Sequence, residues 1–276
     1  MARQKNLTLA ADSYPSLTTE FLSWAKVRRN SLVVPMALAL LVGASAPSHA
    51  HYPVSLSTSH NKAATSPILI DGTISFAVYA NFTKAKEERF VRFALNKGEE
   101  LNLEYLILDQ SPTNRLKNSQ LPSVVVTTPS GKKINLAIKE RTPFYEPFGK
   151  KNYFYLSRVN QSGEAGIYTV RATAKSRSSI VVAIGRTETR GDVLNVGMAQ
   201  GECPAVITKE EMITESRAAQ LIGMTERAAE VCATANKWLY RVGERDGEQF
   251  AVTMDYRSNR ITVSVRSGTI TSVTVG

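Results

Sequence analysis

The sequence predicts a mainly β protein, in which an antiparallel β-sandwich or jelly roll is followed by a small α+β domain. Two observations support this prediction. Short segments rich in β-branched residues alternate with turn residues from Ile68 to Arg186. From Cys203 onward the pattern changes to helical periodicity followed by three strands. A chain of 276 residues that is 43% apolar can bury a substantial core in one or two domains.

Residues 1–50 have the pattern of a secretory signal peptide. A basic patch at Lys26, Arg28 and Arg29 precedes an apolar run from Ser31 to Ala44, and Ser48-His49-Ala50 forms a small-x-small cleavage signal. The alternative is an uncleaved membrane anchor, but the run is shorter than the roughly 20 residues that span a bilayer. We therefore expect export to the periplasm or the medium, with no membrane attachment after cleavage.

The mature chain then divides by composition. Residues 51–67 are rich in Ser and Thr without a period, which predicts a flexible tether. Residues 187–202 contain three glycines and few apolar residues, which predicts a linker between the two domains. The strands expected between these segments are 73–79, 90–95, 101–108, 123–127, 133–138, 153–156, 166–172 and 179–184.

The β-rich segment resembles a known kind of domain. A strand is followed by the turn Asn96-Lys97-Gly98 with acidic residues after it, then by a second strand and, later, by the turn Pro129-Ser130-Gly131. This order is similar to that of the small sandwich domains found beside secreted bacterial peptidases, the pre-peptidase C-terminal type. Such a domain could bind an envelope glycan or protein.

The last segment, 203–276, predicts a compact α+β unit. Helices are expected over 210–222 and 225–237, the second with Thr225 as N-cap. Strands are expected over 238–242, 260–265 and 269–275, and a polar loop over 243–253. Cys203 and Cys232 fall in this unit, and in an oxidising compartment such a pair usually forms a disulfide. Two buried free thiols are the alternative.

Composition argues against most catalytic chemistry. After cleavage only His51 and His60 remain, both in the expected tether, so no folded histidine is available for a catalytic triad or a zinc site. We expect neither enzymatic activity nor a metal or cofactor. The net charge of +10 is spread evenly rather than gathered on one helix, so we do not expect a nucleic-acid partner.

The most specific motif lies between the last loop and the strand after it. It combines Val252-Thr253-Met254-Asp255 with Arg257 and Arg260, a strand beginning near Trp238, and the terminal Gly276. Together these features resemble potato inhibitor I and eglin-like inhibitors. They are closer still to peptidase inhibitor family seventy-eight, the elastase-inhibitor family with the same fold. The resemblance covers residues 203–276.

The resemblance implies that the chain inhibits a serine peptidase of the subtilisin, chymotrypsin or elastase type. Its reactive loop would be Val252, Thr253, Met254, Asp255, Tyr256 and Arg257, with Met254 entering the specificity pocket and Asp255 just after the presented bond. Asn259 and Arg260 would support the loop from below. We expect Arg260 to bond the Thr253 carbonyl or hydroxyl and the Asp255 carboxylate.

Two positions depart from the family pattern. Val275 stands where many members have a second cysteine, so the bridge is either rerouted to Cys203–Cys232 or missing. Thr262 stands where eglin-like proteins have a second arginine. On the competing interpretation, Met254 is a core residue, the last domain is structural and the sandwich binds carbohydrate or an envelope partner.

Overall fold

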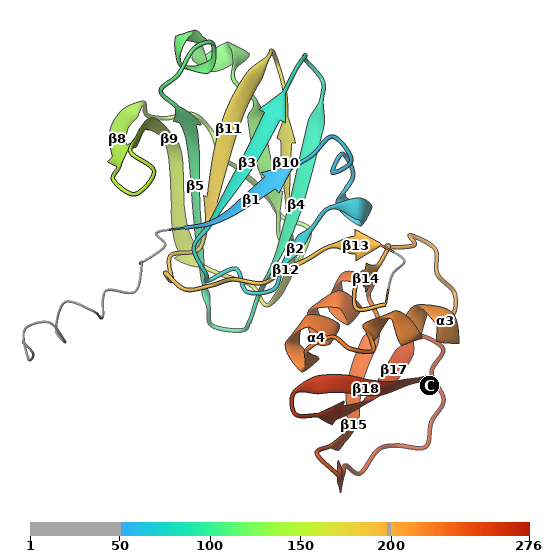
Figure 1. The fold of residues 1–276 in the computed structure, drawn as a ribbon. Coiled ribbons are helices and arrows are strands. Elements are labelled where there is room, and N and C mark those ends of the chain that lie inside the picture. The colour runs from blue at the N-terminus through green and yellow to red at the C-terminus, as the bar shows by residue number, and fades with distance from the viewer. Residues whose placement is uncertain (1–50, 198–199) are drawn as a thin grey trace, which may run out of the picture. The chain divides into compact units, whose positions relative to one another are not determined.

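The computed structural model describes residues 51–197 and 200–276, and the fold is mainly β with mixed sheets (Figure 1). The expected signal peptide, 1–50, lies outside the described residues. Two six-stranded sheets and one four-stranded sheet account for most of the strands.

The first large sheet, sheet A, has the strand order β1-β3-β11-β5-β9-β8. Its strands in that order are β1 Tyr52–Leu56, β3 Phe76–Phe82, β11 Ser178–Ile184, β5 Glu100–Leu108, β9 Lys151–Ser162 and β8 Thr142–Glu146. β1 runs parallel to β3, and every other neighbouring pair is antiparallel. Figure 1 shows this sheet fanned across the upper part of the view.

The second large sheet, sheet B, has the order β12-β2-β4-β10-β6-β7. Its strands are β12 Val193–Leu194, β2 Ile68–Leu69, β4 Glu88–Leu95, β10 Gly166–Thr173, β6 Ser123–Thr127 and β7 Lys133–Asn135. β2 lies parallel to β4 and the other pairs are antiparallel. Short 3-10 turns occupy Ala63–Thr65, Thr113–Arg115 and Asn118–Gln120.

One hydrophobic core is shared by both sheets. Alternate residues of sheet A, such as Phe76 and Leu103, join residues of sheet B, such as Val126, in this core. Phe93 and Tyr168 stack across β4 and β10 with their ring centroids 4.8 Å apart. The period-two pattern of the sequence therefore corresponds to burial on one face of each strand.

The expected tether and linker are wrong in part, because both contain paired strands. Tyr52 to Leu56 pair with Phe76 to Ala80, and Val54 and Leu56 are buried. Val193 and Leu194 pair with β2. These short segments carry too few apolar residues to show a period, but each completes the edge of a sheet whose backbone groups would otherwise be unpaired. The parallel pairs of β1 and β2 also make the sheets mixed rather than purely antiparallel.

The C-terminal region has a four-stranded sheet of order β16-β15-β17-β18. These strands are β16 Glu248–Gln249, β15 Leu239–Arg245, β17 Arg260–Arg266 and β18 Thr269–Val275. Before them come β13 Val196–Gly197 paired with β14 Cys203–Pro204, α3 Glu215–Ala218 continued by a 3-10 turn Ala219–Leu221, and α4 Glu226–Ala235. Thr225 caps α4 as expected, since its hydroxyl accepts from the Ala228 amide.

Two expected elements of this region differ in the structure. The helix expected over 210–222 begins only at Glu215, because Ile213 instead donates its amide to the Ser258 carbonyl. The polar loop expected over 243–253 contains the end of β15 and a hairpin to β16. Asp246 and Gly247 both have positive φ, as a type I′ turn requires, and the Asp-Gly pair was its sequence signal.

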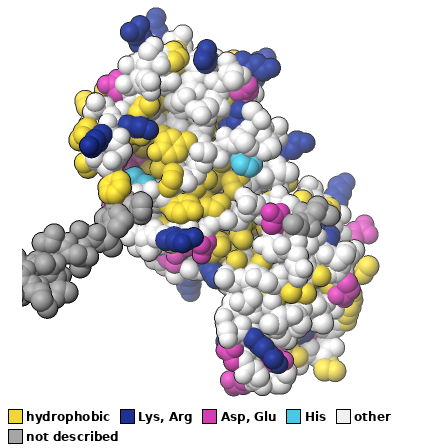
Figure 2. All heavy atoms as spheres, in the orientation of Figure 1, with side chains coloured by type: hydrophobic (Ala, Val, Ile, Leu, Met, Phe, Trp, Pro, Cys, Tyr) yellow, Lys and Arg dark blue, Asp and Glu magenta, His cyan; other side chains and the backbone are white. Residues whose placement is uncertain are grey.

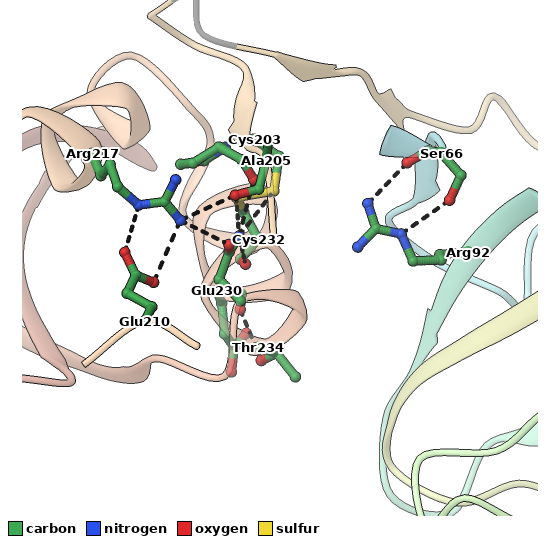
Figure 3. Close-up of a disulfide and its surroundings, with 11 residues drawn as sticks. Ser66, Arg92, Cys203, Ala205, Glu210, Arg217, Glu230, Cys232 and Thr234 are labelled. Carbon is green, nitrogen blue, oxygen red and sulfur yellow. Dashed lines mark hydrogen bonds and ion pairs between the residues drawn. A yellow bond between two sulfur atoms is a disulfide. The ribbon is translucent and has the colours of Figure 1, made fainter. Parts of the chain in front are cut away.

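Cys203 and Cys232 form the disulfide that ties β14 to α4, so the free-thiol alternative is wrong. Beside it, Arg217 donates to the Glu210 carboxylate at 2.6 Å and to the Ala205 carbonyl at 3.1 Å (Figure 3). The Trp238 indole donates to the same Glu210 carboxylate at 2.7 Å. This buried network fixes the segment that precedes α3 and brings it against the start of β15.

Candidate functional site

The candidate site is the connection between β15 and β17. These two strands are parallel neighbours, so the chain must return from the end of β15 to the start of β17. It does so through β16 and then through an extended segment with no regular secondary structure over 250–257. Contacts hold both ends: the Phe250 amide donates to the Gly243 carbonyl, and the Ser258 carbonyl accepts from Ile213.

Side chains of this segment project into solvent. Met254 is 97% exposed, Tyr256 67% and Val252 38%. Met254 is therefore not a core residue, and the competing interpretation of it is wrong on this point. The exposed Met212 lies beside Tyr256, whose hydroxyl is 4.0 Å from the Met212 sulfur. The loop thus presents an apolar surface with one almost fully exposed methionine at its centre.

Arg260 contacts the loop from the start of β17, and of its two expected partners it bonds Asp255. It is 7% exposed at the start of β17 and donates to the Asp255 carbonyl oxygen and to both Asp255 carboxylate oxygens. Its Nε donates at 2.9 Å to the main-chain oxygen of Gly276. The expected bond from Arg260 to Thr253 is absent among the described residues.

Arg241, which lies on the neighbouring strand β15, instead holds Thr253. It donates to the Thr253 carbonyl at 3.2 Å and to the Thr253 hydroxyl at 3.4 Å. Its Nε and Nη2 donate to the Thr262 hydroxyl at 3.0 and 2.8 Å. β15 and β17 are parallel, and Arg241 lies opposite Thr262 in their pairing. The guanidinium that contacts Thr253 therefore comes from β15, whereas the sequence position on β17 where the resemblance would place a second arginine holds Thr262. The sequence analysis missed Arg241, whose only signal was its central place in a strand paired to β17.

The two arginines hold the carbonyls on either side of Met254. The Thr253 carbonyl precedes the Met254 residue and the Asp255 carbonyl follows it, and each accepts from a different guanidinium. Both guanidiniums also reach the main-chain oxygen of Gly276, at 3.3 Å from Arg241 and 2.9 Å from Arg260. The peptide bond between Met254 and Asp255 therefore lies between two main-chain carbonyls, those of Thr253 and Asp255, that are each held by a guanidinium.

Asp255 is the centre of the charge network. A hydrogen bond from the Thr253 side chain, followed by bonds from Arg257 and Arg260, holds the pKa of its carboxyl well below the ordinary value. Arg257 donates to Asp255 at 2.7 Å and is itself exposed. The ionised carboxylate therefore links the residue before Met254 to the strand beneath the loop.

The other predicted support residue does not act through its side chain. Asn259 contributes its main-chain carbonyl, which accepts from the Leu239 amide at 2.8 Å as part of the β15–β17 pairing. Gly276 is required by its surroundings: its φ is 127°, and a Cβ there would lie 2.7 Å from the Tyr256 ring. The close approach of that ring seats the later part of the loop against the end of β18.

The described residues outside the loop also bear on the sequence expectations for metals, membrane spans and histidines. Over 51–197 and 200–276 no group of three or more His, Cys, Asp and Glu residues is placed to hold a metal. Within the same residues no helix is long and apolar enough to cross a membrane. His51 lies in the folded part, contrary to expectation, and its ring bonds the hydroxyl of the buried Ser75.

Comparison with known proteins does not identify the chain. No family model matches it, and no curated protein matches it in sequence.

Proposed function

We propose that residues 203–276 form a peptidase-inhibitor domain of the potato-inhibitor-I type, which presents the loop from Val252 to Arg257 to a serine peptidase. The observation that carries this proposal is the pair of arginines that anchor the carbonyls before and after Met254, while the Met254 side chain stands 97% exposed. We further propose that the two large sheets form a β-sandwich and that residues 1–50 direct export.

Rigid presentation is what distinguishes an inhibitor from a substrate. A flexible loop loses conformational freedom when it enters a peptidase cleft, whereas a loop that already has the bound shape avoids much of that cost. Here the anchoring groups are a 7% exposed guanidinium and a second one braced on Thr262. After cleavage of the Met254–Asp255 bond, the same contacts would keep both new ends near one another, so that religation competes with release.

Met254 indicates the class of peptidase. Its side chain is unbranched, apolar and adaptable, which suits the hydrophobic pockets of chymotrypsin-, elastase- and subtilisin-like enzymes. It cannot satisfy a pocket that carries a carboxylate for a cationic side chain. The exposed Val252, Tyr256 and Met212 would widen the contact toward the roughly 800 Å² per partner of a standard interface.

The test is a titration of subtilisin-, chymotrypsin-, elastase- and trypsin-like peptidases with the chain that begins at His51. We expect stoichiometric inhibition of one or more of the first three and none of the trypsin-like enzyme. Met254→Asp should weaken inhibition at least a hundredfold, about 2.7 kcal/mol, because a charge would enter an apolar pocket. Unchanged potency of this variant would reject Met254 as the contact residue.

Met212→Asp is the matched control. It makes the same chemical change at a second exposed methionine, which lies outside the loop from Val252 to Arg257. We expect it to weaken inhibition less than tenfold. Equal losses in the two variants would show that a general apolar surface, rather than one central side chain, engages the enzyme.

A further inference from the structure

A second feature lies on the outer face of sheet A. In an antiparallel sheet with one face on the core, the opposite face is usually polar. In sheet A the outward positions are apolar as well and nearly buried: Ala77 on β3, Val181 and Ala183 on β11, Leu106 on β5 and Tyr153 on β9. These residues form a cluster separate from the core shared with sheet B. Figure 2 shows hydrophobic side chains gathered over this sheet.

This outer face is hollowed rather than flat. It holds a cavity of about 260 Å³ that reaches across the strands from β1 to β8. The floor includes the small side chains Ala77 and Ala183, and the aromatic rings of Phe144, Tyr153 and Tyr155 form one wall. Phe144 and Tyr155 have ring centroids 5.0 Å apart. Small residues under an aromatic wall leave room for a flat, ring-shaped group.

The wall is held in place by its own hairpin. Glu146, at the end of β8, accepts from the Phe148 amide at 2.7 Å and from the Gly149 amide at 2.6 Å, which folds the turn between β8 and β9. Phe144 pairs with Tyr153 across the two strands. The cavity is therefore built from paired strands and a fixed turn, as a preformed ligand site is.

One carboxylate in the cavity has no hydrogen-bond donor among the described residues. Glu104, on β5, is half-buried among the lining residues; its cross-strand neighbour Arg158 interacts with it through charge, but it makes no hydrogen bond to any residue that the structure describes. By contrast, the hydroxyl of Tyr153 bonds that of Tyr79, and burial is the first cause that raises the pKa of Tyr153. A half-buried carboxylate with free lone pairs requires donors from solvent or from a ligand.

Charge decides what kind of donor fits. Among the described residues that line the cavity there is no Lys or Arg, so an anionic ligand would find no cationic partner in them. A purely apolar ligand would desolvate Glu104 without replacing its hydrogen bonds, at a cost of several kcal/mol. A cation would compete with Arg158, the cross-strand neighbour of Glu104, whose positive charge already acts on that carboxylate. Neutral hydroxyl groups meet none of these penalties.

From these observations we propose that the outer face of sheet A binds a neutral oligosaccharide, with one sugar ring in the cavity. The C–H face of a pyranose carries weakly positive hydrogens, which the negative faces of Phe144 and Tyr155 attract. Its hydroxyl groups donate to Glu104. The cavity is smaller than the roughly 300–1,000 Å³ typical of drug-sized ligands, so the neighbouring sugar units lie along the open surface.

The test uses the chain beginning at His51 and isothermal titration with neutral hexasaccharides of glucose, xylose, mannose and N-acetylglucosamine. Choline, laurate and a polyuronate serve as representatives of the cationic, apolar and anionic classes. We expect binding of at least one neutral hexasaccharide and of none of the other three. Preference for choline, laurate or the polyuronate, or no binding of any hexasaccharide, would overturn the proposal.

Matched variants locate the site. Phe144→Ala and Glu104→Gln should each weaken binding at least tenfold. Tyr145→Ala, next to Phe144 on β8, and Glu100→Gln, on the same strand as Glu104, change residues that do not line the cavity and should leave binding within twofold. Equal losses in the control variants, or unchanged binding in both cavity variants, would reject this face as the site. Peptidase inhibition should be the same in all four variants.

Discussion

Replacing Arg260 by methionine tests the anchoring of the loop most directly. The side chain donates to two main-chain oxygens, one in Asp255 and one in Gly276, and also pairs with the Asp255 carboxylate. A hydrogen bond from a charged group contributes about 1.5–3 kcal/mol. The carboxylate is 42% exposed, so water screens its ion pair and that pair adds little. The bond to Gly276 stabilises the end of the sheet rather than the loop.

The loop itself therefore loses about 2–3 kcal/mol, which corresponds to a roughly 30- to 150-fold weaker inhibition constant. We expect Arg260→Met to be cleaved after Met254 faster than the unmodified chain, because the loop then behaves as a flexible substrate. The assay combines peptidase titration with mass spectrometry of the products. Inhibition within threefold of the original, with no increase in cleavage, would refute the anchoring role.

Two further variants separate anchoring from folding. Arg241→Met removes only one strong contact with the loop, at the Thr253 carbonyl, so a smaller loss of roughly 5- to 30-fold is expected from about 1–2 kcal/mol. Arg227→Met breaks an exposed pair with Glu230 on α4 and should change neither inhibition nor cleavage. A loss of inhibition in Arg227→Met equal to that in Arg260→Met would show that the assay reports general destabilisation.

Two other predictions concern the disulfide and the effect of pH. Replacing Cys203 and Cys232 together by alanine should lower the free energy of unfolding by about 3–4 kcal/mol, given a sequence separation of 29. Urea denaturation measures this change. An unchanged denaturation midpoint would contradict the prediction. Because the pKa of Asp255 is depressed, its ionised form supports the loop at every pH above the ordinary value of 3.8 and is lost only as the pH falls through the lower folded value. The carboxyl carbon resonance of Asp255 should therefore keep its ionised position when the pH is lowered from 7 to 3.8, whereas a midpoint near 3.8 would show that the network is not formed.

The strands with clear alternation were predictable from the sequence. Ser123–Thr127 and Thr269–Val275 have the expected bounds, because alternating β-branched residues and flanking turns mark each of them. β1 and β12 were missed because short edge strands take their pairing from a neighbour rather than from their own pattern. The helix expected from residue 210 was shortened by a tertiary contact, that of Ile213 with Ser258.

The candidate loop could be located from sequence, but its supports could not be fully assigned. Exposure of Met254 and the Arg260–Asp255 contacts follow the motif. Arg241 could not be identified, because its contact with Thr253 depends on the parallel register of β15 and β17. The cavity on sheet A could not be predicted from the sequence either. Phe144 and Glu104 lie far apart in the chain, and the strand order β5-β9-β8 brings them to one cavity.

The position of the disulfide has a consequence for a clipped molecule. Cys203 and Cys232 both precede Met254, so a break after that residue separates 255–276 from the rest of the chain with no covalent tether. The clipped form would behave as a split protein, in which β17 and β18 stay in place through noncovalent contacts such as the pairing with β15 and the bonds from Arg241 to Thr262 and Gly276. The fraction of clipped molecules that stay assembled would fall on dilution, because a dissociated 255–276 peptide rebinds in a second-order reaction.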